Sequence, residues 1–381
     1  MKEDWEIKKL GDIVDIINGK NQSQVISDDG KYPIYGSGGN IMGYATDYIC
    51  EKGTTIIGRK GNISNPIFID ERFWNVDTAF GIYPKNQSDP KFINYLCQTI
   101  DFKSRNKGTT IPSLVKSDLQ TIEIPFPKSL PEQQRIVSIL DEAFSAIARA
   151  KANAEQNLKN AAALFESYLQ GVFENKGEGW EENTLSQLFD VKHGFAFQGE
   201  FFSNLGEYVL LTPGNFFEEG GYRDRGEKQK YYIGEIPSDF ILQKGDLLVA
   251  MTEQAAGLLG SPIIVPASNK FLHNQRLGLI IPKQNVEIDN EFFFHVFNLK
   301  RVRKALHDSG TGVKVRHTSP TKIGQVEISY PKSLKEQQTI VRQLDALRAE
   351  TQKLEAIYRQ KILNLEELKK SVLQKAFNGE L

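Results

Sequence analysis

The hydrophobic pattern of the chain is dominated by two long stretches with the same spacing. They cover residues 130–173 and 334–377, and in both the apolar residues recur three and four positions apart. This spacing is typical of a coiled-coil seam, in which one stripe of a helix faces a partner helix. The first seam consists of Val137, Leu140, Phe144, Ile147, Ala154, Leu158, Ala161, Phe165 and Tyr168. The second seam consists of Ile340, Leu344, Leu347, Leu354, Tyr358, Leu365, Leu368 and Val372.

The second stretch repeats the first at a constant offset of 204 residues. Residues 132–134 (Glu-Gln-Gln) recur as 336–338, and 140–141 (Leu-Asp) recur as 344–345. Each stretch predicts a helix about 65 Å long, which is too long to lie inside one domain core. A helix with one apolar stripe needs a partner, and the other copy is the obvious one. We therefore predict an antiparallel pair that holds two globular domains apart; the alternative is two surface helices, each packed on its own domain.

The segments that precede the two helices also resemble one another. Trp5-Glu6 near the start returns as Trp180-Glu181, directly after the first helix. Glycine, asparagine and proline then divide both halves into short apolar runs, which predict strands and turns. The expected fold class is α+β, with two similar globular domains, two long helices and a pseudo-two-fold internal repeat. The expected divisions are domain 1 at 1–129, the central helix at 130–173, domain 2 at 174–333 and the C-terminal helix at 334–381.

Sparse landmarks recur inside the two globular halves, whereas the loops differ. A turn into an apolar strand at 52–58 matches 244–250, and a Gly-Thr turn at 108–110 is aligned with 310–312. The glycine-rich run 35–40 has no counterpart in the second half. A shared framework with different loops is expected when two domains recognise different targets.

Composition is that of a globular protein large enough for two or three domains. The 381 residues carry a net charge of −1 and contain two cysteines, Cys50 and Cys97. Lone cysteines in apolar surroundings exclude a cysteine-rich zinc site and suit a reducing compartment. No apolar run near the start or elsewhere approaches the length of a signal peptide core or a membrane span, so we expect a cytoplasmic protein.

These features together resemble the specificity subunit of a type I restriction-modification enzyme. The most specific part is Pro-x-x-Leu-x-Glu-Gln-Gln at the start of each long helix, at Pro127 and Pro331. The resemblance implies two target-recognition domains that read a split double-stranded DNA sequence, and no catalytic centre on this chain. It also implies two adenine methyltransferase subunits that carry S-adenosylmethionine, and restriction subunits with ATP and Mg²⁺ that can join them.

The search for catalytic chemistry agrees with that implication. The sequence has no Walker A lysine motif, no Asn-Pro-Pro-Tyr-type methyltransferase motif and no clustering among its histidines. We therefore expect no cofactor and no metal on this chain.

The remaining candidates are basic or polar residues close to glycine. Arginine can read guanine and asparagine can read adenine, while lysine and threonine can hold phosphates. Between residues 298 and 318, six Lys or Arg residues face one acid, although a solvated helix face would show the same charge run. The candidate DNA contacts are Arg59, Lys60, Asn62, Lys103, Arg105, Lys107, Thr109, Thr110, Arg301, Lys304, Lys314, Arg316, His317 and Thr318. Weaker candidates are Thr252, Glu253 and Gln254.

Two other functions remain open from the residues alone. The duplicated helices could form a non-catalytic scaffold whose globular domains bind protein, or the chain could be the recognition subunit of another split restriction-methylation system. Binding to heparin or mixed DNA, with and without a methyltransferase subunit, separates a scaffold from a DNA-recognition subunit. The target sequence does not follow from the side chains, because contacts on loops do not translate into bases without a docking geometry.

Overall fold

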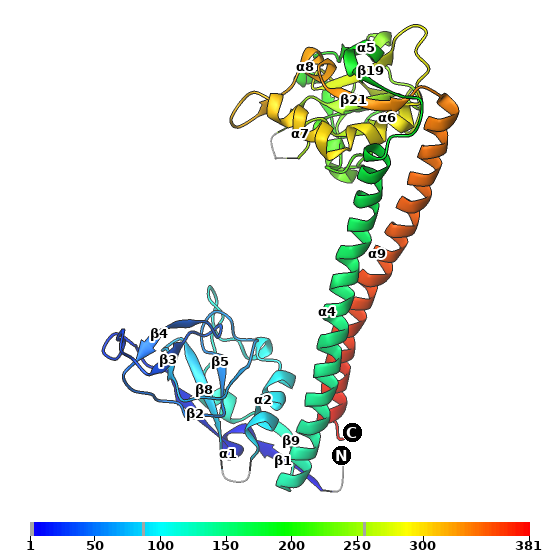
Figure 1. The fold of residues 1–381 in the computed structure, drawn as a ribbon. Coiled ribbons are helices and arrows are strands. Elements are labelled where there is room, and N and C mark those ends of the chain that lie inside the picture. The colour runs from blue at the N-terminus through cyan, green and yellow to red at the C-terminus, as the bar shows by residue number, and fades with distance from the viewer. Residues whose placement is uncertain (1–3, 86–87, 254–256) are drawn as a thin grey trace. The chain divides into compact units, whose positions relative to one another are not determined.

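The computed structural model describes residues 4–85, 88–253 and 257–381. The chain forms two compact units that each contain one globular domain and half of each long helix. Unit 1 comprises Met1–Gln156 and Tyr358–Leu381, and unit 2 comprises Asn157–Ile357. Figure 1 shows the course of the chain through both units.

Unit 1 is built from short strands and helices in the following order: β1 (Trp5–Lys9), α1 (Leu10–Ile13), β2 (Val14–Asn18), β3 (Tyr32–Tyr35), β4 (Ile41–Ala45), β5 (Thr54–Gly58), β6 (Ile67–Ile69), β7 (Trp74–Asn75), β8 (Ala79–Pro84), α2 (Pro90–Thr99), η1 (Lys103–Arg105), α3 (Lys116–Gln120), β9 (Glu123–Pro127) and the start of α4 (Leu130–Glu174). The main antiparallel sheet has the order β2-β8-β5-β6, and a second sheet has the order β4-β3-β7. Strand β5 is buried along its whole length, as its continuous apolar and threonine sequence predicts.

Unit 2 repeats this plan with more 3₁₀ turns: β10 (Trp180–Thr184), α5 (Leu185–Leu188), β11 (Phe189–His193), η2 (Gly199–Phe201), β12 (Phe202–Ser203), β13 (Tyr208–Leu210), η3 (Pro213–Asn215), η4 (Gly226–Lys228), β14 (Tyr231–Tyr232), η5 (Ser238–Phe240), β15 (Leu247–Ala250), β16 (Thr252–Glu253), β17 (Pro262–Ile264), β18 (Phe271–Leu272), β19 (Leu277–Pro282), α6 (Asn290–Phe297), α7 (Lys300–Ser309), β20 (Arg316–His317), α8 (Pro320–Gly324), β21 (Glu327–Pro331) and the start of α9 (Leu334–Phe377). Its main sheet has the order β11-β19-β15-β17, and its second sheet has the order β12-β14-β13-β18. In both units the first strand of the globular part pairs with the last: β1 pairs with β9, and β10 pairs with β21.

The long helices α4 and α9 pack against each other, and their contacts in unit 1 give the direction. Phe144 and Lys151 of α4 contact residues 369 and 366 of α9, and Arg135 contacts residue 381 beyond its end, so the residue number in the partner segment falls as that in α4 rises. The two helices are therefore antiparallel, as the sequence predicted (Figure 1). The predicted α+β class, with two similar globular domains and two long helices, is confirmed.

The core of each unit is continuous with the coiled coil. In unit 1, Val137 and Leu140 of α4 and Phe377 of α9 join the cluster that contains the buried ring of Phe92. In unit 2, a matching cluster combines residues of both long helices with those of α6: Leu169, Phe173, Ile340, Leu344, Phe292 and Phe293. Each half of the helix pair is therefore fixed to its own globular part by apolar burial, and not by the seam alone.

The predicted seams are only partly buried. Leu140, Ala154, Ala161 and Leu344 are at most 5% exposed. By contrast, three predicted seam residues are 39–48% exposed: Tyr168, Leu354 and Leu368. The sequence interpretation was wrong for these three positions, because the spacing identifies an apolar stripe and not the width of the contact that covers it.

Candidate nucleic-acid interface

In unit 1, three segments that lie far apart in the sequence form one edge, here called the first rim. It consists of residues 59–62, 76–78 and 107–113. The backbone N–H of Arg59 donates to the carbonyl of Thr78 at 2.8 Å, and the N–H of Gly61 donates to the carbonyl of Pro112 at 2.9 Å. These backbone hydrogen bonds hold the predicted Arg-Lys-Gly-Asn and Gly-Thr loops side by side.

The 107–113 loop of the first rim is also fixed from within. The side-chain oxygen of Asn106 accepts hydrogen bonds from the N–H groups of Gly108 and Ser113, both at 2.8 Å. A Cβ on Gly108 would lie 1.9 Å from the carbonyl oxygen of Ile111, so the tight turn requires glycine there. Asn106 therefore shapes the loop that presents Thr109 and Thr110.

Unit 2 contains an equivalent edge, the second rim, which consists of residues 251–253, 274–276 and 311–317. The N–H of Met251 donates to the carbonyl of Arg276 at 2.9 Å, and β16 pairs with β20 through Thr252 and His317. The N–H of Thr311 donates to the carbonyl of His317 at 2.9 Å and closes the loop. The two rims therefore share one backbone framework and differ in their side chains.

The framework corrects one alignment made from sequence. Gly108–Thr110 was aligned with Gly310–Gly312, whereas the structure makes Gly108 equivalent to Gly312. A Cβ on Gly312 would lie 2.1 Å from the carbonyl of Val315, the same relationship that Gly108 has with Ile111. The 204-residue offset of the long helices thus extends back into these loops. The short Gly-Thr match was misleading because two letters cannot fix a register.

The candidates of unit 1 fall into two groups. The candidates whose side chains are exposed on the first rim are Lys60, Asn62, Lys107, Thr109 and Thr110. Arg59 is half-buried, with its guanidinium 5.8 Å from the centre of the Phe80 ring and 3.4 Å from the carbonyl of Asp77. Lys103 and Arg105 lie beside the rim on η1, where Asp101 caps the backbone N–H of Lys103.

In unit 2, the 311–317 loop of the second rim places Lys314 and His317 at the surface and turns Arg316 inward. Both Lys314 and His317 are exposed. One guanidinium nitrogen of Arg316 donates to the carbonyl of His307, and another lies 2.6 Å from the His307 ring. Thr318 is 8% exposed. Arg316 therefore stabilises the loop from within, and Thr318 is buried next to the rim.

A buried carboxylate supports the second rim from below. Glu253 is 2% exposed, and one of its oxygens accepts from the N–H groups of Gly257, Leu258 and Leu259 at 2.9–3.0 Å. Its other oxygen lies 4.0 Å from the Nε of Arg316. Glu253, a weaker candidate in the sequence, thus organises the loop, whereas Gln254 lies outside the described residues.

The cations of α7 are dispersed and do not form one patch. Lys304 forms an ion pair with Asp308 one turn away. Arg301 lines a cavity of about 240 Å³ along β10 and β21, together with Glu182 and Glu327. Arg303 turns toward the carbonyls of Glu218 and Gly257, and burial lowers its pKa to about 10. Arg301 and Lys304 therefore belong to α7 and not to the three segments that form the second rim.

Sequence reasoning missed the middle segment of each rim. Residues 76–78 and 274–276 are turns that follow the two-residue strands β7 and β18, without a glycine or a run of like charge. Their signal would have been a polar turn between two apolar runs at the same place in both halves, namely Asp77-Thr78 and Gln275-Arg276.

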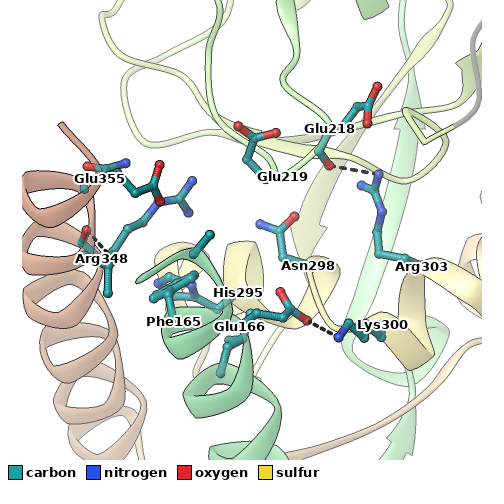
Figure 2. Close-up of a pocket in the computed structure, with 14 residues that line it drawn as sticks. Phe165, Glu166, Glu218, Glu219, His295, Asn298, Lys300, Arg303, Arg348 and Glu355 are labelled. Carbon is teal, nitrogen blue, oxygen red and sulfur yellow. Dashed lines mark hydrogen bonds and ion pairs between the residues drawn. The ribbon is translucent and has the colours of Figure 1, made fainter. Parts of the chain in front are cut away.

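Unit 2 also has a cavity of about 590 Å³ between the long helices and the start of α7. Figure 2 shows side chains of both signs around it. Lys300 lies 3.4 Å from Glu166, and the guanidinium of Arg348 lies 5.4 Å from the centre of the Phe165 ring. The Nε2 atom of His295 lies 3.3 Å from the Oδ1 atom of Asp345. Because its cations are engaged by acids and rings of the same unit, this cavity is a weaker site for a polyanion than the rims.

The described residues were also compared with the requirements of a metal site and of a membrane-spanning helix. Among residues 4–85, 88–253 and 257–381, no group of three or more His, Cys, Asp or Glu side chains could hold a metal ion. Within the same ranges, no helix is long and apolar enough to cross a membrane.

The curated proteins to which this chain is similar include specificity subunits of type I restriction enzymes. The chain is 23% identical over 404 residues to the type I restriction enzyme MjaVIII specificity subunit of Methanocaldococcus jannaschii, and this match covers 100% of the chain and 93% of the relative. It is 26% identical over 220 residues to the EcoBI specificity subunit of Escherichia coli, with 57% and 42% covered. It is also 25% identical over 331 residues to the StySPI specificity subunit of Salmonella potsdam, with 80% and 69% covered.

Solved structures show the same fold. A chain from a structure on the assembly and conformational transition of the type I R-M system superposes with a TM-score of 0.79 at 16% identity, covering 100% of this chain and 99% of that one. The HsdS subunit from Thermoanaerobacter tengcongensis superposes with a TM-score of 0.64 at 17% identity, covering 100% and 98%. The family model described as the type I restriction modification DNA specificity domain matches residues 2–159 and 177–364. Since these two matches include most of the chain, the chain belongs to the type I restriction-modification specificity subunit family.

Proposed function

We propose that this chain reads a bipartite double-stranded DNA target, with one half-site recognised by each unit. The observation that carries the proposal is the pair of rims, which present different side chains on equivalent backbones. Lys60, Asn62 and Lys107 are exposed on the first rim, whereas Thr252, Lys314 and His317 occupy the second. Exposed polar side chains on a rigid framework suit base reading, and the differences between the rims give each half-site its own sequence.

The charge balance fits a subunit that acts within a complex. With a net charge of −1, the chain lacks the broad positive field that gives tight, non-specific DNA binding on its own. Local cations on the rims would orient the duplex, and a partner would supply the remaining positive surface. We therefore expect strong DNA binding only in the presence of the methyltransferase subunit.

The long helices supply a surface for such a partner. Large apolar side chains that are 39–59% exposed lie along them: Leu164, Tyr168, Leu354 and Ile357 in unit 2, and Leu363 and Leu368 in unit 1. We propose that these exposed apolar side chains contribute to the surface that contacts the partner. Since both units contain a half of each helix, the proposal includes two methyltransferase subunits for each copy of this chain, and a helix length that sets the gap between half-sites.

The chemistry belongs to the partners in this proposal. S-adenosylmethionine binds to the adenine methyltransferase subunits, and ATP with Mg²⁺ binds to motor-nuclease subunits where these join the complex. This chain contributes recognition and assembly, without a catalytic centre or a cofactor of its own.

The test is to reconstitute the chain with its methyltransferase subunit and to sequence the methylated DNA at single-molecule resolution. The expected result is N6-methyladenine in one split motif with a fixed gap, and a mass in solution that corresponds to two partners and one copy of this chain. Methylation of a continuous motif would refute the proposal that each unit recognises one half-site. Absence of both methylation and DNA binding, with the partner bound, would make the chain a scaffold.

A further inference from the structure

The turn formed by residues 274–276 is held by hydrogen bonds to neighbouring segments of unit 2. The N–H of Gln275 donates to the carbonyl of Phe195 at 3.0 Å, and the N–H of Arg276 donates to the side-chain oxygen of Asn274 at 3.1 Å. The carbonyl of Arg276 accepts from Met251 at 2.9 Å. Gln275 and Arg276 are therefore each tied to a neighbouring segment, and Asn274 closes the turn from within.

A buried histidine supports the same turn. His273 is 0% exposed, and its Nε2 lies 2.9 Å from the carbonyl of Leu277, so the ring bridges the two ends of the turn. Because a carbonyl oxygen can only accept, Nε2 is the donor in this hydrogen bond. Burial lowers the pKa of His273 to about 4, so the ring is neutral near pH 7. His273 is thus a positioning residue for the turn.

The side chains on this fixed backbone point outward. Gln275 and Arg276 are exposed, whereas Asn274 and Leu277 on either side are buried. Within the described part of the chain, the guanidinium of Arg276 makes no hydrogen bond and no ion pair. This separates Arg276 from Arg303 and Arg316, whose guanidinium groups are engaged within unit 2.

Unit 1 has the same turn with different chemistry. The carbonyl of Thr78 accepts from Arg59 as that of Arg276 accepts from Met251, so the two residues are equivalent. Residues 77–78 are Asp-Thr, whereas 275–276 are Gln-Arg. The backbone of this turn is therefore the same in both units, whereas the hydrogen-bonding groups on its side chains differ.

We infer that Arg276 reads a guanine base edge in the half-site of unit 2, with Gln275 beside it on the same turn. Arginine offers two parallel donors to the O6 and N7 acceptors of guanine, and a backbone fixed in advance lowers the ordering cost of that contact. Side chains held on such a turn are more precisely placed than those at the tip of a free loop. The inference rests on the proposed DNA-recognition function and identifies a residue that determines its specificity.

The test compares the reconstituted methyltransferase complex carrying Arg276→Ala, Arg276→Lys or the control Lys244→Ala. Lys244 is an exposed cation of the same unit at the turn before β15. Methylation is measured on a library in which every base of both half-sites is varied. Arg276→Ala should lower the preference for guanine at one position of one half-site by about 10- to 100-fold. The other half-site should be unchanged.

Arg276→Lys separates a base contact from a phosphate contact. Lysine keeps the charge but has one ammonium in place of the planar pair of donors, so a base-reading role predicts a reduced preference for guanine at the same position in Arg276→Lys. The inference would be overturned if Arg276→Ala had the methylation profile of the wild type. It would also be overturned if Arg276→Ala weakened methylation of all sequences equally and Arg276→Lys restored it. Either result leaves the proposed function intact if the wild-type complex still methylates a split motif, whereas failure of the wild-type complex to do so refutes the function itself.

Discussion

The side-chain oxygen of Gln133, at the start of α4, accepts a hydrogen bond at 2.8 Å from the backbone N–H of Asp89, the cap of α2. Its side-chain nitrogen donates to the carbonyl of Pro127 at 3.3 Å. In unit 2, Gln337 accepts from the N–H of Asp289 at 2.8 Å and donates to the carbonyl of Pro331 at 2.9 Å. The Glu-Gln-Gln motif thus fixes each long helix to the cap of a globular helix.

This arrangement predicts that Gln133→Leu and Gln337→Leu each destabilise the unit that contains them. Both glutamines are 0% exposed, and leucine leaves a buried backbone donor and acceptor without partners. The expected loss is about 2–3 kcal/mol in the free energy of unfolding, measured by urea denaturation. The controls are Gln134→Leu and Gln338→Leu at the exposed neighbouring positions. Equal effects at the buried and exposed positions would contradict the proposed anchoring.

The rims predict different outcomes for exposed and inward-facing cations. Lys107→Ala and Lys314→Ala should each lower DNA affinity of the complex without changing the melting temperature, because both side chains are exposed. A base contact should cost about 1–3 kcal/mol at one base position, and a phosphate contact should weaken all sequences and reduce the salt dependence. Each change should affect only its own half-site. Unchanged affinity and methylation in both variants would remove these loops from the interface.

Arg316→Ala should behave differently, because this guanidinium is engaged with His307 inside the second rim. We expect a lower melting temperature together with weaker reading of several adjacent bases of one half-site. A narrow, single-base effect at unchanged stability would instead assign Arg316 a direct contact. Thermal denaturation and methylation sequencing of the same preparations distinguish the two.

The antiparallel helix pair predicts that its length sets the gap between half-sites. The contact between Lys151 and Glu366 shows which parts of α4 and α9 lie opposite each other in unit 1. One heptad inserted after Ala154, together with one after Ile362, should preserve the seam and lengthen both helices by about 10 Å. Methylation sequencing should then show a changed gap and unchanged half-sites. Altered half-site sequences would contradict this role of the helices.

The end of the chain lies beside its beginning in unit 1. Arg135 donates to the backbone oxygen of Leu381 at 2.9 Å, and Leu381 lines a cavity together with Asp4 and Trp5. A circular permutant that joins Leu381 to Met1 by a short linker, with new ends between Asn175 and Gly179, should therefore fold and keep its DNA target. Met1 itself lies outside the described residues. A one-to-one complex with the methyltransferase, or loss of folding, would count against two equivalent halves.

The sequence by itself determined the long helices and the repeat. A period of three and four residues is a local property, so it predicted α4 and α9, and the 204-residue offset predicted two equivalent units. The Glu-Gln-Gln motif predicted where each helix starts, but not that Gln133 and Gln337 accept from the N-cap residue of a second helix. That role depends on burial of the glutamine against a segment more than 40 residues away.

Only the tertiary structure determined the composition of the rims. Residues 59–62, 76–78 and 107–113 meet through backbone hydrogen bonds between distant segments, which leave no periodic signal in the sequence. The same applies to the roles of individual cations, because Arg276 and Arg316 look alike in the sequence. One remains exposed on a fixed turn and the other is engaged by His307, since the fold decides which guanidinium finds a partner inside the protein.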